Sequence, residues 1–137
     1  MLESEGVEKL VQYWLEGSEK DLKSAENIFE FAGEYAASLF FAHLAVEKAL
    51  KAQLVKVTKL HAPFTHNLIH LIQKLNWVPD LDIETKLSEI NDFNLQGRYP
   101  DEKGEFRLKA TQEFCNLKLK DVKEVLKWIL LKSNPES

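Results

Sequence analysis

Cysteine is almost absent from this 137-residue chain, since Cys115 is the only one. A lone cysteine excludes a disulfide within the chain and any cysteine-rich metal site. Because Cys115 lies within an apolar helical pattern, the sequence predicts a buried structural thiol rather than a nucleophile.

Long hydrophobic runs are missing as well. The longest mostly apolar stretch, 35–46, has 12 residues and includes His43, so it is too short to cross a bilayer. No basic segment followed by an apolar one opens the chain, so no secretory signal peptide is expected. The net charge of −4 argues against binding nucleic acid by bulk charge, but it permits a local basic pocket. We therefore expect a cytoplasmic protein without membrane contact.

Alternating strand patterns and internal repeats are also absent, whereas apolar residues recur at three- and four-residue steps through nearly the whole chain. The sequence thus predicts an all-α, up-and-down helical bundle of about five helices, three long and two short. We expect a single domain over residues 1–137, with its core at about 7–132 and a short flexible C-terminal tail at 133–137.

The apolar pattern also places the helices, which are expected at about 7–32, 35–57, 66–75, 82–97 and 105–132. Gly17 and Ser18 interrupt the first helix, but the apolar stripe keeps its phase, which favours one continuous helix. Thr65 is the predicted N-cap of the third helix, and residues 98–104 are predicted to form a polar loop. The second helix is apolar almost all round in its first half, so it is either the central helix or packs against a second copy of the chain.

Motifs for metal binding and common catalysis are weak or missing. His66 and His70 have the i,i+4 spacing that can place two imidazoles on one metal, and His61 lies nearby. No carboxylate is interleaved as in zinc-protease helices, so we predict no metal site. The sequence also lacks a glycine-rich phosphate loop and a local nucleophile signature.

Arg98 and Tyr99 lie between two helix-breaking residues, Gly97 and Pro100. In one interpretation Arg98 contacts the carbonyl groups at a helix end while Tyr99 packs on the core. In the other, the Arg98 guanidinium binds a phosphate or carboxylate at a pocket rim, and Tyr99 offers a stacking face or a hydroxyl.

Three stretches together are similar to one known family: YAASLFFAHLAVEKALKAQL (35–54), PFTHNLIHLIQKL (63–75) and GRYPDE (97–102). They resemble the small prokaryotic HEPN domain proteins in order and separation, over roughly residues 7–130. The resemblance implies a helical bundle that forms a homodimer and pairs with a minimal nucleotidyltransferase, in a toxin–antitoxin-like or substrate-binding arrangement. We expect no cofactor.

Many HEPN proteins are metal-independent ribonucleases with an R-x4–6-H motif, and this sequence departs from that motif. The positions that should hold a histidine after Arg98 are Lys103, Gly104 and Glu105. The corresponding positions after Arg107 are 112–114, which also lack histidine. The motif therefore does not predict an enzyme.

A nucleotide- or phosphate-binding site is what remains, with candidate residues Arg98, Tyr99, His66, Lys51, Glu47 and Asp101. Arg98 would bind phosphate, Tyr99 would stack or hydrogen-bond, and Glu47 would orient Lys51 one helical turn away. Two alternatives stay open. The protein is either a ribonuclease toxin that uses Arg98 with His66, or a structural subunit in which Arg98 pairs with Glu47 or Asp101 and binds no ligand.

Overall fold

The computed structural model describes residues 1–95 and 99–133, and every regular element within them is helical. The elements are α1 (Ser4–Asn27), which continues into a π-helical turn (Ile28–Ala32), α2 (Tyr35–Thr58), α3 (Leu68–Leu75), α4 (Leu81–Asn91), α5 (Pro100–Lys109) and α6 (Gln112–Ser133). The predicted all-α bundle is confirmed. In the described part of the chain, no helix is long and apolar enough to span a membrane.

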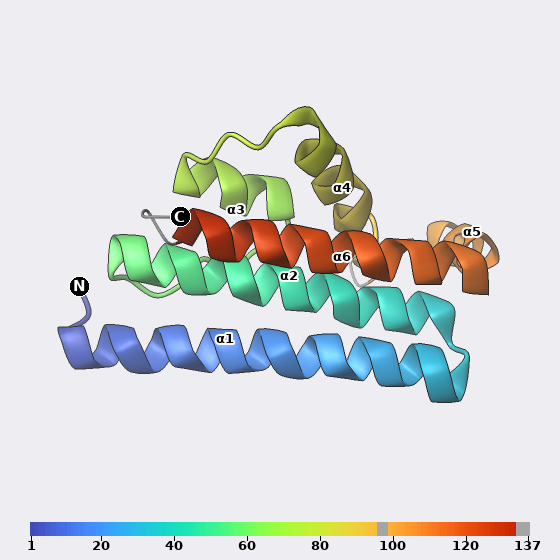
Figure 1. Ribbon diagram of the computed structural model, residues 1–137, viewed down its shortest axis with the longest axis horizontal. Coiled ribbons are helices and arrows are strands. Elements are labelled where there is room, and N and C mark those ends of the chain that lie inside the picture. Colours follow the sequence, from blue (N-terminus) through green and yellow to red (C-terminus); the bar gives the residue numbers. More distant parts are fainter. Residues whose placement is uncertain (96–98, 134–137) are drawn as a thin grey trace.

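Helices α1 and α2 form a long antiparallel hairpin (Figure 1). Gly33 makes the turn with a positive φ of 66°, a conformation that glycine adopts without steric cost. Two buried serines join the helices: Ser18 donates to the Ala45 carbonyl at 2.6 Å and Ser38 donates to the Ala25 carbonyl at 2.7 Å. As predicted, α1 continues through Gly17 and Ser18, because the Ser18 hydroxyl bonds to α2 and does not cap a new helix.

Helix α2 is the centre of the bundle and packs against α1, α3 and α6. Helices α3, α4 and α5 carry the chain back, so that α6 runs beside α2 in the same direction (Figure 1). The buried apolar side chains of α2 include Leu39, Val46 and Leu50. The central position therefore explains the apolar first half of this helix within one chain, and a second copy is not needed for that purpose.

The predicted polar loop at 98–104 is wrong in the part that the structure describes. Helix α5 begins at Pro100, with Tyr99 as its N-cap. Proline is favoured in the first helical turn, and Asp101 and Glu102 there complement the helix dipole. Gly104, the last residue of the predicted loop, lies inside the helix.

The predicted single helix over 105–132 is also wrong, because these residues form the end of α5 and a separate helix, α6. The chain leaves the helical conformation at Ala110, with ψ of 73°, and the Thr111 hydroxyl then accepts from the Phe114 amide to start α6. After this break, Cys115 and Leu119 of α6 face the core, while Leu117 is exposed.

The ends of the two short helices differ from their predicted positions. Asn67, rather than Thr65, caps α3, because the Asn67 Oδ1 atom accepts from two backbone amides. Asp80 caps α4, which ends at Asn91 and does not continue to 97. Both caps are residues whose short polar side chains favour this position.

Candidate functional site

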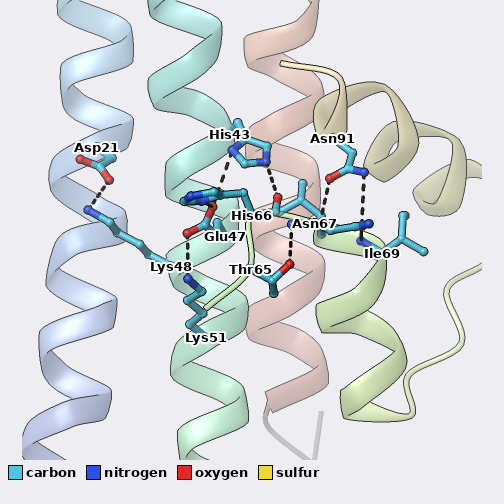
Figure 2. A network of polar contacts seen from close by, with 11 residues as sticks. Asp21, His43, Glu47, Lys48, Lys51, Thr65, His66, Asn67, Ile69 and Asn91 are labelled. Carbon is cyan, nitrogen blue, oxygen red and sulfur yellow. Dashed lines mark hydrogen bonds and ion pairs between the residues drawn. The ribbon is translucent and has the colours of Figure 1, made fainter. Parts of the chain in front are cut away.

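A buried carboxylate on α2, Glu47, is the centre of a polar cluster. Its Oε2 atom accepts from Lys51 Nζ at 3.0 Å, one helical turn along, and its Oε1 atom lies 2.7 Å from Nδ1 of His66 (Figure 2). The Glu47 and Lys51 side chains are 4% and 7% exposed, whereas the His66 ring is 49% exposed. The structure therefore brings three of the predicted site residues together, with one of them accessible to solvent.

His43 completes the cluster from the turn before Glu47. Its Nε2 atom bonds to the carbonyl oxygen of His66 at 2.9 Å, while its Nδ1 atom lies 3.9 Å from Glu47 Oε1, too far for a hydrogen bond. Burial lowers the pKa of His43 below 6.5, and the nearby Glu47 charge opposes that shift only in part. His43 is therefore neutral at pH 7 and donates from Nε2. His43, Glu47, Lys51 and His66 are called the α2 polar cluster below.

The backbone around His66 is held in place on its C-terminal side. Asn67 caps α3, and Thr65 Oγ1 accepts from the Asn67 amide at 3.1 Å. Asn91, at the end of α4, accepts from the Leu68 amide at 2.8 Å (Figure 2). With the His43 contact, these bonds fix the start of α3 relative to α2 and α4, so the His66 ring has a defined position.

Helix α1 closes the buried side of the cluster. Lys51 Nζ lies 5.3 Å from the centre of the Trp14 ring, a cation–π distance. One turn away, Lys48 pairs with Asp21 of α1 at 2.7 Å, and Gly17 gives the Lys48 stem room to pass. Lys51 is thus enclosed between Glu47 and Trp14, and it acts on the site through Glu47 and not as a free surface cation.

The remaining predicted site residues lie at the start of α5. Tyr99 is 76% exposed, so it does not pack its ring on the core. Asp101 is exposed in the first turn of α5. Arg98, together with its predicted contacts to phosphate, Glu47 or Asp101, lies outside the described residues. Within residues 1–95 and 99–133, no hydrogen bond or ion pair joins Tyr99 or Asp101 to the α2 polar cluster.

The histidines considered as metal ligands do not converge. His66 is directed to Glu47, while His61 and His70 are exposed on the loop and on α3. Among the described residues, no group of three or more histidine, cysteine, aspartate and glutamate side chains is placed to hold a metal ion. Cys115 is fully buried, and burial raises the pKa of its thiol, so the prediction of a structural thiol is confirmed.

The contact between Glu47 and His66 defines what the cluster can do. A carboxylate that accepts from Nδ1–H fixes the tautomer of an imidazole and leaves Nε2 as the exchangeable nitrogen. No partner of His66 Nε2 is found in the described part of the chain. An oriented imidazole at the surface can donate to a phosphate oxygen or transfer a proton, depending on its protonation state.

His43 is the member of the cluster that sequence reasoning missed. It lies inside the most apolar stretch of the chain, where a histidine resembles a core residue. The available signal was its spacing, because His43, Glu47 and Lys51 follow one another at four-residue steps and so share one face of α2.

Comparisons with known proteins agree with this fold. The model of the HEPN domain matches residues 11–133. TT1696 from Thermus thermophilus has 21% sequence identity and a TM-score of 0.68, over 89% of this chain and 97% of that chain. ST0689, an archaeal HEPN homologue, has 22% identity and a TM-score of 0.71, over 90% of this chain and 98% of that chain. No curated protein matches. Since the family match covers most of the sequence, the chain belongs to the HEPN domain family.

Proposed function

We propose that this HEPN protein is the non-catalytic partner of a minimal nucleotidyltransferase and binds a nucleotide or RNA phosphate at the α2 polar cluster. The observation that carries the proposal is the buried Glu47 carboxylate, which holds Lys51 on one side and the half-exposed His66 ring on the other. A surface imidazole oriented in this way donates a hydrogen bond from Nε2 to a phosphate oxygen when it is in its protonated, imidazolium form. Arg98 and Tyr99, predicted from the sequence to join the site, would add a cation and an aromatic ring.

The partner and the oligomeric state rest on family membership, since small prokaryotic HEPN proteins pair with minimal nucleotidyltransferases and dimerise. Large apolar side chains exposed on the surface support the proposal that this chain contacts another protein chain. Among the described residues, the most exposed are Met1, Phe64, Val78 and Leu108. Light scattering should give twice the 15.8 kDa of one chain, and a strict monomer at tens of micromolar would contradict the dimer.

Nucleotide binding is tested by titrating AMP and a short RNA against the wild type, Arg98→Ala and His66→Ala. We expect both variants to bind at least about tenfold more weakly, which corresponds to about 1.4 kcal/mol for a lost charge-assisted hydrogen bond. His70→Ala, on an exposed face of α3, is the matched control and should bind as the wild type does. Equal affinity in all four proteins would reject the site and favour a structural subunit.

The partnership is tested by co-expression with the nucleotidyltransferase encoded in the adjacent reading frame. The two proteins should co-purify in a stable complex and elute together in size-exclusion chromatography. If no such reading frame lies nearby, or the two proteins elute separately, the partnership is wrong even if nucleotide binding is correct.

A ribonuclease is the second candidate, and one observation favours it: the 2.7 Å contact between Glu47 and His66 is the arrangement of an oriented acid–base pair. In this alternative His66 takes the role of the missing motif histidine and Arg98 stabilises the phosphate charge. Purified protein should then cleave RNA in EDTA, and both His66→Ala and Glu47→Gln should lose cleavage. Cleavage that survives in His66→Ala would show that His66 is not the acid or base.

A further inference from the structure

A cavity of about 450 Å³ lies where the end of α4, helix α5 and the first turns of α6 meet. Phe93, Phe106 and Phe114 give it an aromatic wall. Phe93 and Phe106 are almost fully buried, with ring centroids 5.8 Å apart, and Phe114 meets Phe93 edge-on at 6.4 Å. The volume is within the usual range for small-ligand pockets. The residues of the α2 polar cluster are not among its described lining, so this cavity is separate from the site proposed above.

Carboxylates outnumber cations around the aromatic wall. The described lining holds four carboxylates, Glu89, Asp92, Glu102 and Glu105, and two ammonium groups, Lys109 and Lys118. The acids come from α4, from its C-cap and from the first two turns of α5. Among the described residues, no three acidic, histidine or cysteine side chains are placed to hold a metal ion. The carboxylates are therefore spread around the cavity, and their oxygens do not converge on one point.

Two lysines of the chain show which cations the aromatic wall accepts. The Lys109 Nζ atom lies 5.4 Å from the centre of the Phe114 ring, and the Lys118 Nζ atom lies 5.6 Å from it. Both are cation–π distances. Burial opposes the charge of Lys118, but its contacts with Glu89 and Asp121 raise its pKa, so it is an ammonium at pH 7. The wall thus already binds primary amines on alkyl chains.

Glu102 and Glu105 have no cation of their own. Both are exposed on α5, and among the described residues no ion pair joins either of them to a basic side chain. Lys109 follows Glu105 by four residues, the spacing of a helical ion pair, yet its ammonium lies over the Phe114 ring. The chain therefore leaves two negative charges at the mouth of an aromatic cavity, where a cation from outside would complement them.

The shape of the cavity and the spread of its charges select one class of cation. A metal ion needs several oxygens that converge on one point, and the described residues do not offer them. A linear polyamine carries ammonium groups separated by methylene segments. Its charges therefore reach separate carboxylates, while its methylene segments lie along apolar rings as a lysine stem does.

We propose that the cavity between α4, α5 and α6 binds a linear polyamine: one ammonium group bonds to Glu102 and Glu105, and the alkyl chain packs against the aromatic wall. The exposed Lys109 ammonium is the group that the ligand displaces from the Phe114 ring. The inference goes beyond the function proposed above, because the ligand is a cation and its site contains no residue of the α2 polar cluster.

The experiment measures the affinity of spermidine for the full chain by isothermal titration calorimetry, at constant ionic strength. Glu102→Gln/Glu105→Gln removes the two charges at the mouth, and Phe114→Leu removes a ring but keeps every charge. Glu8→Gln/Glu19→Gln is the matched control: it makes the same change of charge with two exposed glutamates of α1, which have no ion pair among the described residues. Circular dichroism melts show that each variant is folded before its affinity is measured.

We expect Glu102→Gln/Glu105→Gln to bind spermidine at least about tenfold more weakly than the wild type, and the α1 control to bind within about twofold of it. Phe114→Leu should bind about threefold more weakly, because a cation–π contact is lost. Lys109→Gln should bind more tightly, since the competing ammonium is gone. Putrescine, which has two charges and not three, should bind the wild type more weakly than spermidine, and Mg²⁺ should not displace spermidine.

The inference is overturned if Glu102→Gln/Glu105→Gln binds spermidine as tightly as the wild type does. An equal loss in the α1 control, or displacement of spermidine by Mg²⁺, would also overturn it, because either result would show a general attraction to an acidic protein. Unchanged affinity in Phe114→Leu would overturn the cavity as the site and leave only the exposed acids. Spermidine binding should persist in His66→Ala, so failure of the nucleotide site and failure of this site are distinguished.

Discussion

The Glu47–Lys51 and Asp82–Lys86 pairs share the same four-residue spacing, but their surroundings differ. Glu47 and Lys51 of α2 are buried, at 3.0 Å, whereas Asp82 and Lys86 of α4 lie at the surface, at 2.7 Å, with Asp82 71% exposed. Lys86 also contacts Glu124, and hydrogen bonds to Asp82 and to Glu124 raise its pKa. The sequence spacing is identical in the two pairs. Burial therefore decides whether such a pair is only a surface ion pair or also positions a neighbouring side chain such as His66.

The largest expected effect is the loss of the buried carboxylate. Glu47→Ala leaves the Lys51 ammonium buried without its partner, so the free energy of unfolding should fall by about 3–5 kcal/mol. Urea denaturation measures this change. The matched surface variant, Asp82→Ala, removes the i,i+4 partner of Lys86, which keeps its contact with Glu124, so it should leave the urea midpoint nearly unchanged. Equal effects of the two variants would contradict the distinction between the pairs.

Acid pH should lower the free energy of unfolding through the buried side chain of His43. Because its folded pKa is lowered, the unfolded chain binds a proton near pH 6.5 that the folded chain does not bind. Stability is therefore fully present above pH 6.5 and is lost as pH falls toward the folded pKa, by at most about 1.4 kcal/mol per pH unit. Urea midpoints between pH 7.5 and 5.5 measure this slope. His43→Gln should flatten it, and an unchanged slope in that variant would assign the effect to other groups.

The cap of α3 gives a smaller expected effect. Asn67→Ala removes the side chain that accepts from the Ile69 and His70 amides, so it should cost about 1 kcal/mol of unfolding free energy. Thr65→Ala removes one weaker contact, to the Asn67 amide, and should cost less. Thermal or urea unfolding of both variants compares them. A greater loss in Thr65→Ala would mean that the sequence-predicted cap dominates after all.

The smallest effect is expected from replacing the whole buried pair. Glu47→Leu/Lys51→Met removes both charges together and fills the space with apolar groups, so stability should stay within about 1 kcal/mol of the wild type. His66 would lose its orienting carboxylate in the same protein. If this double variant were as unstable as Glu47→Ala, the pair itself, and not the unpaired charge, would account for the stability.

The fold was predictable because the long helices carry continuous apolar stripes. The α1–α2 hairpin followed from two apolar helical patterns, at about 7–32 and 35–57, the first of which keeps its phase across Gly17. The HEPN resemblance followed from stretches along α2 and α3. The region after α4 was less predictable. Residues 98–104 were predicted to form a polar loop that ends at Gly104, but Pro100 and two acidic residues start α5. The irregular turn at Ala110 has no strong sequence signal. Such short helices depend on tertiary packing more than on local propensity.

The site was predictable only in part, for a similar reason. Glu47 and Lys51 are related by helix spacing, which sequence shows directly. His66 reaches Glu47 only through the fold. The sequence does not mark His43 as a polar-site residue, because its neighbours are apolar. Contacts between elements are thus what the sequence leaves undetermined.

The most direct test of the central claim, that the α2 polar cluster is a ligand site and not only a structural tie, measures affinity and stability on the same protein. We predict that His66→Ala weakens AMP or RNA binding at least about tenfold while losing less unfolding free energy than Glu47→Ala. His66 is half-exposed, so water can replace its contacts in the folded chain. Unchanged affinity in a His66→Ala protein that is as destabilised as Glu47→Ala would contradict the claim and leave the cluster as a structural connection between α2 and α3.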